Sequence, residues 1–460
     1  MLLLRKIYLL TAAFLIATGI SAIAQTGSIK GKVLDKTSKE PLPFANVIVE
    51  MNGSQAGGAQ TDFDGNFTIK PLQPGKYNLK ATFVGYTSAE ITGVLVSSDK
   101  ITFQDVTLTK GAVDITAVDV TDYKNPIIDK GNPSSQTTIT QEEIQVAPTR
   151  DVKSVAATTA GVFQKDEGDD VNIRGSRTDA TDYYVDGIKV RGSTALPQSG
   201  IEQITVVTGG VPAQYGDATG GIINITTRGP SKEFFGGVEF VTSELFDKYG
   251  YNLIGANVSG PIWSKKNNEG KVDRTIVGFF LSGEYQIEKD PDPSAIGMYK
   301  VKDDIFNDIK KNPLSPTLNG GTVFRNKTEF LTADDFEKIK AKQNVDSKGY
   351  RVSGKIDIQP VDNITLTFGG SYDHNAKQEF TLNYALYNFD NNNDKIEDAW
   401  RVFGRLTQKL GGAKGSSESS ASVIKNAFYS IQVDYNKTKT VLQDGDHEDR
   451  FFDYGYIGKF

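Results

Sequence analysis

Cysteine is absent from the 460-residue chain, and histidine occurs only twice, at His374 and His447. Disulfide frameworks and thiolate metal sites are therefore excluded. After the first 23 residues there is no apolar run of the roughly 20 residues that a membrane-spanning helix needs. The formal net charge of −6 gives no reason to expect nucleic acid as a partner. What the chain has instead is 46 glycines and 10% aromatic residues, a mixture typical of strands joined by tight turns.

The N-terminus has the pattern of a secretory signal peptide. Arg5 and Lys6 form a charged start, an apolar stretch runs from residue 7 to 20, and Ala22-Ile23-Ala24 is a small-residue cleavage site. This pattern predicts that residues 1–24 are removed and that the mature protein leaves the cytoplasm. An uncleaved membrane anchor is the alternative.

Residues 25–110 alternate apolar and polar residues in short bursts separated by turn clusters, which predicts a β-sandwich. The motifs G-x-V-x-D, P-L-P-F-A-N-V-x-V, T-D-x-x-G-x-F and L-x-P-G-x-Y occur in this order. The segment resembles the carboxypeptidase-regulatory-like domain, which implies a transthyretin-like sandwich without catalysis of its own. An attached zinc carboxypeptidase would need a His-x-x-Glu pair, and neither histidine has a glutamate three residues later.

Residues 111–133 are extended in bias, without a helical period, and read as a linker. Extended peptides can bind by adding an edge strand to another protein's sheet, with main-chain hydrogen bonds supplying the affinity. A plain inter-domain linker is the alternative on local sequence.

Residues 134–230 predict an α+β domain. Thr140 opens a capping box and Thr149 is expected to cap a second short helix, and strand-like segments joined by glycine-rich turns follow. The glycines match neither a phosphate loop nor the GxGxxG spacing, so nucleotide binding is not expected.

The order of motifs in this segment is specific. It contains R-D-V-K-S-V, then A-G-V, N-I-R-G, Y-V-D-G, I-E-Q-I-T-V-V-T-G-G and Q-Y-G-D-A-T-G-G-I-I-N-I-T-T-R. Together these resemble the plug domain of TonB-dependent outer-membrane receptors. A plug sits in a polar, wet barrel lumen, which suits the charges of both signs between residues 171 and 192. The resemblance assigns a structural role in the plug to Arg174, Gly175, Asp186, Gly187, Gly209, Gly210, Tyr215, Gly216, Gly220, Gly221 and Asn224.

Residues 231–460 show period-two alternation in stretches of about ten residues, such as Val277–Ile287 and Ile364–Tyr372. This pattern favours transmembrane β-strands with apolar residues outward and polar residues inward. About seven such strands can be counted, whereas barrels of this type have an even number and plugged lumens belong to barrels of about 22 strands. The expected fold is mainly β, with a sandwich, a plug and the first strands of an incomplete barrel, and we expect the natural chain to continue.

One loop holds a weak metal candidate. Asp390, Asn392 and Asp394 could bind calcium through side-chain oxygens, but the sixth-position glycine of a calcium loop is missing, so a solvated loop is favoured. No other metal and no cofactor is expected.

The plug resemblance implies a receptor, not an enzyme, that imports a scarce nutrient across the outer membrane with its N-terminal domains on the periplasmic side. It implies a TonB-type energy-transducing partner, outer-membrane lipid and a small extracellular ligand, and it allows a surface lipoprotein as a further partner. The TonB-contact candidates are Val113, Asp114, Ile115, Thr116, Ala117, Val118, Asp119, Val120 and Thr121. Two alternatives remain, a non-transporting binding or secretion-associated protein that keeps the plug fold, and an adhesin-like β protein. Siderophores, cobalamin-like molecules, peptides and oligosaccharides all stay open as ligands.

Overall fold

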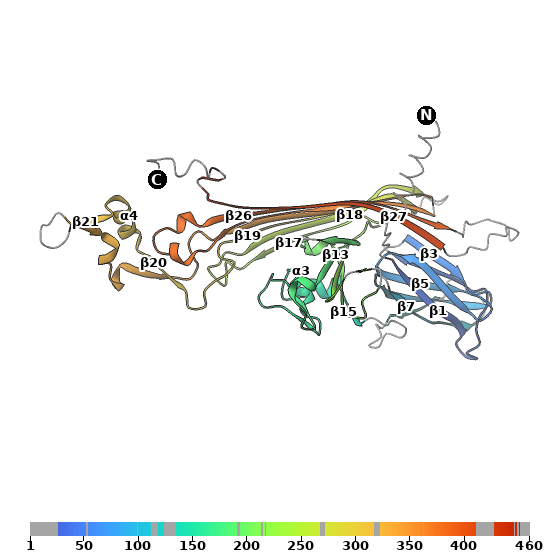
Figure 1. Cartoon of the computed structure of the whole chain (residues 1–460). Coiled ribbons are helices and arrows are strands. Elements are labelled where there is room, and N and C mark those ends of the chain that lie inside the picture. Colours follow the sequence, from blue (N-terminus) through green and yellow to red (C-terminus); the bar gives the residue numbers. More distant parts are fainter. Residues whose placement is uncertain are drawn as a thin grey trace, which may run out of the picture.

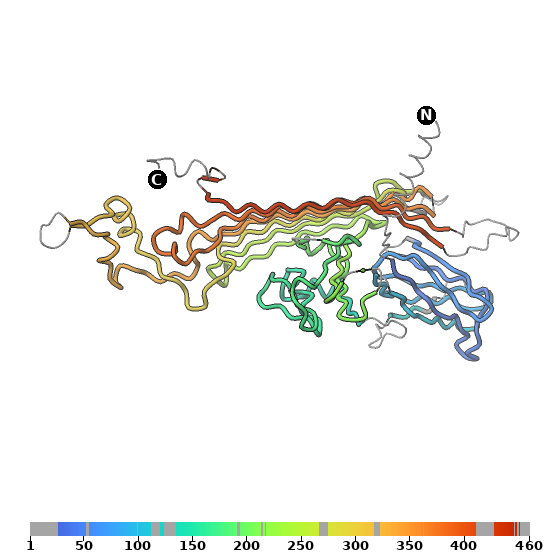
Figure 2. The backbone as a smooth tube through the Cα atoms, viewed as in Figure 1, coloured from blue at the N-terminus to red at the C-terminus, as the bar shows by residue number. Residues whose placement is uncertain are grey.

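The chain folds into three consecutive units (Figure 1). The computed structural model describes residues 26–51, 54–98, 100–111, 118–123, 135–190, 194–212, 215–216, 218–266, 272–316, 323–361, 363–410, 427–445, 447–448 and 450. The expected signal peptide, residues 1–24, lies outside these ranges. A long sheet runs the length of the molecule, and the other two units lie against one of its faces (Figure 2).

The first unit is a β-sandwich. Its strands are β1 (Gly27–Asp35), β2 (Asn46–Met51), β3 (Ser54–Gln60), β4 (Asn66–Leu72), β5 (Gly75–Thr82), β6 (Tyr86–Val96), β7 (Ile101–Phe103), β8 (Val106–Lys110) and β9 (Val118–Asp122), in the spatial order β3-β2-β5-β6-β8-β1-β4 with β7 on β1 and β9 on β6. The alternation of buried and exposed residues in β5 shows how the strands form the core of the sandwich. Tyr77, Leu79 and Ala81 are buried in the core, while Lys76 points outward. The predicted sandwich is confirmed.

Asp35 ties the start of the sandwich to β6. Its carboxylate accepts the N–H of Ser38 at 2.9 Å, the hydroxyl of Tyr86 at 2.8 Å and the N–H of Thr37 at 2.7 Å. The hydrogen bonds from Ser38, Tyr86 and Thr37 lower the pKa of Asp35 below its usual value of 3.8.

The lowered pKa of Asp35 gives a pH prediction. The ionised form is favoured in the folded state, so its contribution to stability is complete above 3.8 and is lost as the pH falls through the lower folded pKa. We expect the D35N variant to show a flatter fall in sandwich stability between pH 5 and pH 2 than the native chain. Urea unfolding followed by hydrogen–deuterium exchange of sandwich peptides, corrected for intrinsic exchange rates, measures both curves. Parallel curves for the two chains would contradict the assignment.

The second unit spans β10 to β16 and is α+β. We call it the plug unit, after the resemblance seen in the sequence. It contains β10 (Ser135–Thr140), α2 (Gln141–Gln145), α3 (Val152–Ala156), β11 (Val162–Phe163), β12 (Asn172–Ile173), η1 (Thr178–Ala180), β13 (Asp182–Val185), β14 (Ile188–Val190), η2 (Gln198–Gly200), β15 (Ile201–Gly209) and β16 (Ile222–Thr227). Five strands form a mixed sheet in the order β10-β15-β16-β13-β14. Ile204, Val206 and Ile225 are almost completely buried in its core, and α2 and α3 contact β15.

The helix caps of this unit agree only partly with the sequence. The capping box of α2 is present, with the Glu143 carboxylate accepting the N–H of Thr140 at 2.7 Å. The cap predicted for α3 was wrong. Asp151, not Thr149, accepts the N–H of Ser154 at 2.9 Å, because Thr149 uses its hydroxyl to accept the N–H of Asp151. A carboxylate two residues further on competes well for the helix N-terminus.

The β13–β14 hairpin turns on two residues, Asp186 and Gly187, with φ of 49° and 89°. Positive φ at both central positions defines the type I′ turn, whose twist matches that of the flanking strands. Aspartate and glycine are the residues that tolerate this backbone. The turn fixes the Asp186 carboxylate at the tip of the hairpin, where it faces the long sheet.

The third unit is the long sheet. It is a seven-stranded antiparallel meander of β17 (Phe235–Thr242), β18 (Asn252–Lys266), β19 (Val272–Glu288), β24 (Ser347–Val361), β25 (Ile364–Glu379), β26 (Asn393–Leu410) and β27 (Ala427–Gln443), each paired with the next. The seven strands counted from the sequence are confirmed. Alternation is confirmed too. Val352, Phe368 and Val433 are exposed on the far face, whereas Ser353 and Thr367 are buried on the face that meets the plug unit.

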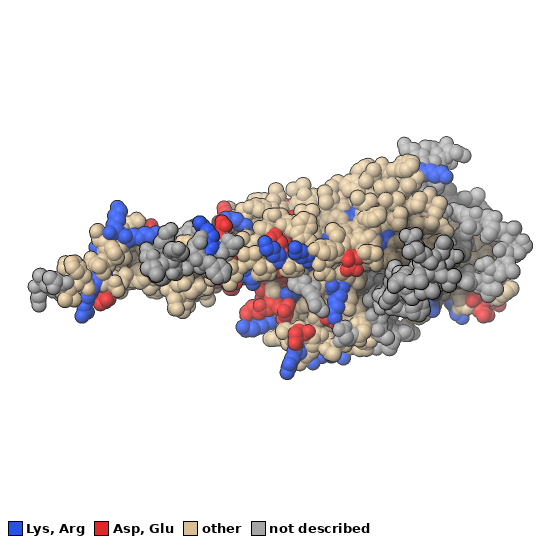
Figure 3. Space-filling model, turned by 45° about the horizontal axis from the view of Figure 1, so that its top comes forward, with Lys and Arg blue, Asp and Glu red and all other residues tan. Residues whose placement is uncertain are grey.

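The far face of the long sheet is apolar. It carries few charged side chains over the middle of the sheet, whereas Lys, Arg, Asp and Glu gather around the second unit and at the loop end (Figure 3). Trp400, Val402 and Tyr435 are each about half exposed there. A half-exposed row of large apolar side chains is unusual for a surface in water. Within the described part of the chain, no helix is long and apolar enough to span a membrane.

The longest connections gather at the end of the sheet opposite the sandwich (Figure 1). They hold β20 (Met298–Val301), α4 (Asp303–Lys311), β21 (Leu314–Pro316), β22 (Phe324–Asn326), η4 (Lys327–Phe330), η5 (Ala333–Asp335), β23 (Phe336–Ile339), η6 (Leu382–Tyr384) and η7 (Phe389–Asn391). Two loops are fastened to each other here, because Phe306 stacks on Phe389 and the Asn392 amide donates to the Asn344 carbonyl at 2.7 Å. The short connection between β24 and β25, where Val361 pairs with Ile364, lies at the sandwich end.

Candidate functional site

The surface between the second unit and the long sheet is rich in hydrogen bonds and ion pairs. We call it the plug–sheet interface, made by residues 150, 186, 198–200 and 227 on one side and by inward residues of β17, β19, β24, β26 and β27 on the other. The side chains of Asp186, Glu284 and Lys355 in this interface are largely held away from bulk water. Such groups stay stable only when each charge has a partner.

Asp186 is the centre of one half of this interface. Its buried carboxylate lies 3.1 Å from the Nζ of Lys355, and it accepts the N–H of Thr227 at 3.1 Å and the Thr227 hydroxyl at 2.5 Å. The main-chain carbonyl of Asp186 accepts hydrogen bonds from the side chains of Arg405 and Gln432. The hairpin tip therefore contacts three strands of the sheet, β24, β26 and β27.

Glu284 is the centre of the other half. Its side chain is 3% exposed, and Oε1 accepts the N–H of Gln198 at 2.6 Å. Arg150 lies 3.5 Å from Oε1 and Arg351 lies 3.8 Å from Oε2. Arg150 also pairs with Glu239 of β17, so the second unit reaches two strands through one guanidinium.

These ion pairs form a continuous chain of alternating charge. It runs from Glu239 through Arg150, Glu284 and Arg351 to Asp373, where the last separation is 3.3 Å. Only Arg150 belongs to the second unit. One plug residue therefore completes a chain that contains four sheet residues, and it ties the second unit to β17 and β19.

Short contacts between small residues complete the interface. The Ser199 and Ser282 hydroxyls are 2.7 Å apart, and the Ser259 hydroxyl accepts the N–H of Ser231 at 2.9 Å. A methyl group at Gly200 would stand 2.6 Å from the Ser353 hydroxyl. The plug unit and the sheet are therefore packed at hydrogen-bond distance, not separated by a layer of solvent, at this level.

The sandwich is attached to both other units. Lys409 of β26 donates to the Ala56 carbonyl at 2.9 Å, and Lys76 pairs with Glu142 at 2.7 Å. Near this junction, burial raises the pKa of Glu202 in β15, and Arg228 at 3.9 Å acts in the opposite direction. The sandwich thus lies at the short-turn end of the sheet, on the same face as the plug unit.

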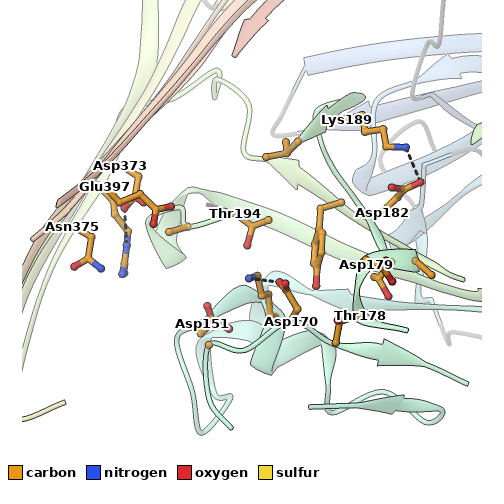
Figure 4. Close-up of a pocket in the computed structure, with 18 of the residues that line it drawn as sticks. Asp151, Asp170, Thr178, Asp179, Asp182, Lys189, Thr194, Asp373, Asn375 and Glu397 are labelled. Atoms are coloured by element: carbon orange, nitrogen blue, oxygen red, sulfur yellow. Dashed lines mark hydrogen bonds and ion pairs between the residues drawn. The ribbon is translucent and has the colours of Figure 1, made fainter. Parts of the chain in front are cut away.

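A cavity of about 840 Å³ opens between the plug unit and the loop end of the sheet (Figure 4). Its lining holds six carboxylates, from Asp151, Asp170, Asp179, Asp182, Asp373 and Glu397, and three cationic side chains, from Lys153, Lys189 and Arg351. The first two lysines are engaged, Lys153 with Asp170 at 2.7 Å and Lys189 with Asp182 at 2.9 Å. The cavity is therefore polar and carries an excess of negative charge.

The predicted structural residues of the plug lie in turns and close contacts. Arg174 and Gly175 have φ of 50° and 77°, and the Arg174 guanidinium lies so close to Gly209 that an added Cβ there would stand 2.7 Å from Nη1. Tyr215 packs edge-to-face on Tyr184 with ring centroids 5.0 Å apart. Gly210 and Gly216 both have φ of 62°, a Cβ at Gly220 would stand 2.6 Å from the Ala180 carbonyl, and Asn224 is buried in β16. Among these residues, Asp186 reaches the long sheet through Lys355 and Arg405.

Gly221 supports a stability prediction. A Cβ at this position would stand 2.5 Å from Ile173 Cδ1 and 2.8 Å from the Val207 carbonyl. We expect the G221A variant to lose about 1–3 kcal/mol of plug stability through overpacking. The matched control is G229A, where nothing lies within 4 Å of the added methyl group. Urea midpoints from plug-peptide exchange compare the two, and equal midpoints would contradict the packing argument.

The linker candidates are only partly described. Positions 113–117 lie outside the described residues, while 118–121 belong to β9, which pairs with β6 of the sandwich in parallel. The metal candidates do not converge. Asp390 pairs with Lys310 at 3.2 Å, and the Asn392 oxygen accepts the N–H of Thr381. Within the described ranges no cluster of three acidic or histidine side chains could hold a metal ion.

Sequence reasoning missed most of the residues at the interface. Ser282 and Glu284 are polar members of the alternating stretch Val277–Ile287, and Lys355 lies in β24, but alternation alone does not show that they contact the plug. Arg150 lies in the R-D-V-K-S-V motif without having been singled out. The available signal was the inward phase of a charged residue in a membrane-like strand, since a charge there needs a partner.

Comparison with known families assigns two of the three units. Residues 28–109 match the carboxypeptidase regulatory-like domain, and residues 129–222 match the TonB-dependent receptor plug domain. The plug match begins five residues before the start expected from the sequence.

Curated relatives extend the match beyond the plug. The TonB-dependent transporter Oar of Myxococcus xanthus is 28% identical over 79% of this chain and 34% of its own length. A probable TonB-dependent siderophore receptor, PirA of Acinetobacter baumannii, is 33% identical over 27% of this chain and 20% of its own length. The chain thus spans about a third or less of these relatives.

Among solved structures, the siderophore receptor PirA from Acinetobacter baumannii aligns with a TM-score of 0.39 and 18% identity, over 67% of this chain and 45% of that one. Proteins of the matched family are receptors and transporters, not enzymes. With a plug domain behind a carboxypeptidase regulatory-like domain, the chain is similar to the TonB-dependent receptors over these two domains.

Proposed function

We propose that this chain is the plug-bearing part of an outer-membrane receptor that takes up a scarce small ligand with energy from a TonB-type partner. The observation that carries the proposal is the two-faced long sheet. Its apolar face suits lipid, and its polar face holds the plug through buried ion pairs. A soluble sandwich would have no use for a half-exposed row of Trp400, Val402 and Tyr435.

The two ends of the sheet favour one orientation. The sandwich and the short connection between β24 and β25 lie at one end, and the long loops lie at the other (Figure 1). Barrels of this class have short periplasmic turns and long outer loops. We therefore place the sandwich, the linker and the TonB-type partner in the periplasm, and the loops outside the cell.

The polar cavity supports a place for the ligand. It lies on the loop side of the plug, between the outer ends of β24, β25 and β26 and the plug residues around Asp151 and Asp182 (Figure 4). A ligand arriving through the outer loops would meet this cavity first. The excess of carboxylates favours neutral or cationic ligands over polyanions. Siderophores, cobalamin-like molecules, peptides and oligosaccharides of that charge all fit this proposal.

Energy dependence of ligand accumulation tests the proposed function. Cells that produce the full-length protein are compared with cells lacking it, using radiolabelled members of each ligand class, with and without a protonophore. We expect one class to accumulate only in producing cells with an intact proton gradient. Accumulation that ignores the protonophore, or binding without accumulation, would favour the non-transporting alternative.

Location in the outer membrane needs its own experiment. The protein recovered from the outer membrane is expected to migrate differently on gel electrophoresis before and after heating, because closed barrels resist the detergent until they are heated. A protein found only in the soluble periplasmic fraction would overturn the outer-membrane assignment. The same fraction shows whether a surface lipoprotein copurifies.

A further inference from the structure

The linker strand is already paired within the chain. β9 adds to the edge of β6 as a parallel strand, with Ser88 opposite Val118 and Thr92 opposite Asp122. At its end, the N–H of Tyr123 donates to the Thr92 carbonyl at 2.9 Å, and the Thr92 hydroxyl donates to the Thr121 carbonyl at 3.4 Å. Of the residues that the sequence assigns to partner contact, positions 118–121 therefore occupy a sheet edge of the sandwich.

The pairing depends on the main chain more than on side chains. Val120 is 60% exposed, and Thr121 and Asp122 are also exposed. The side chain that packs against the sandwich core at this place is Tyr123, just beyond the partner-contact candidates. Edge strands held by main-chain hydrogen bonds tolerate many sequences and can exchange between acceptors of the same geometry.

We propose that the β6 edge, Ser88–Thr92, is a docking site that withholds the linker from the periplasmic partner. β9 pairs either with this edge or with a sheet edge of the TonB-type protein, because the backbone groups that face β6 cannot serve both. The sandwich then sets how much of the linker is available, and the apparent affinity for the partner falls in proportion to the docked fraction. This inference rests on the proposed function.

A reversible crosslink tests the competition. Thr92 and Asp122 are directly opposite, and the Thr92 hydroxyl lies 3.4 Å from the Asp122 carboxylate, so both side chains point to the same side. The chain has no cysteine of its own, which makes the T92C/D122C pair unambiguous. Neither position lies among the partner-contact candidates, residues 113–121.

The readout is binding of the purified C-terminal domain of the TonB-type protein to the full-length receptor in detergent. We expect the oxidised pair to bind at least about tenfold more weakly than the reduced pair. Each single-cysteine variant is the matched control and should bind equally before and after treatment with the same oxidant. The Y123A variant removes the core anchor and should bind more tightly than the native chain.

Equal binding by the oxidised and reduced pair would overturn the competition, since it would mean that the partner adds to the outer edge of β9 without displacing it. Hydrogen–deuterium exchange of residues 118–123, measured without partner, separates two kinds of failure. Unprotected amides would overturn the docking itself. Protected amides in a chain that binds no partner even when reduced would overturn the proposed energy coupling.

Discussion

An asparagine in place of Asp186 is expected to weaken the attachment of the plug to the long sheet by about 3 kcal/mol. The variant keeps the size of the side chain and its tolerance of positive φ, so the type I′ turn is retained. What it removes is the negative charge beside Lys355, whose side chain is only 12% exposed. Removing one member of a buried ion pair leaves the other charge without compensation, which is the costly case.

The urea concentration at which plug peptides lose exchange protection measures the loss. D186N/K355Q is the matched control, because it also removes the lysine charge that lies 3.1 Å from the Asp186 carboxylate. We expect it to recover stability relative to the single variant, with a coupling energy of at least about 1 kcal/mol between the two sites. In cells, the single variant should also admit large antibiotics that the native receptor excludes. A native urea midpoint for D186N would mean that the hairpin tip does not hold the plug.

Proline in place of Val120 is expected to reduce energy-dependent uptake at least about tenfold, which corresponds to about 1.4 kcal/mol of lost partner binding. Proline has no N–H and restricts the residue before it, so it cannot take part in a regular strand. The plug–sheet contacts are distant from this position, so the amount of folded protein in the membrane should not change.

The V120T variant controls for the loss of the valine side chain. Threonine keeps the N–H and the β-branched shape, and the side chain at this position is mostly exposed. Uptake by V120T should equal that of the native chain. Equal uptake by V120P and V120T would mean that the TonB-type partner does not bind this strand.

Protection of residues 118–123 from exchange should also fall in V120P. The same substitution breaks the pairing with β6, so a released linker that still fails to support uptake would show that release alone is insufficient.

The sequence by itself determined the elements and their faces. Period-two alternation identified the seven long strands and showed which side chains point inward, because successive residues of a strand face opposite sides. The plug resemblance gave Asp186 and Gly187 a structural role, whereas the two-residue hairpin turn that they form became visible in the structure. The motif order from Arg150 to Arg228 identified the plug.

Only the tertiary structure decided which inward residues meet the plug. Arg150 and Glu284 are 134 positions apart, and Asp186 and Lys355 are 169 apart. Alternation shows which face of the sheet a residue occupies, but not which plug residue lies opposite it. That depends on the register of the strands and on the position of the plug along them.

The pairing of β9 with β6 could not be predicted from the sequence either. Extended bias in the linker predicted that it could lie as a strand, but not which edge would accept it. Main-chain pairing depends little on the identity of the side chains. The residue pattern of either strand therefore does not predict which strand it pairs with. The acceptor is decided by where the sandwich leaves an edge open within reach of the linker.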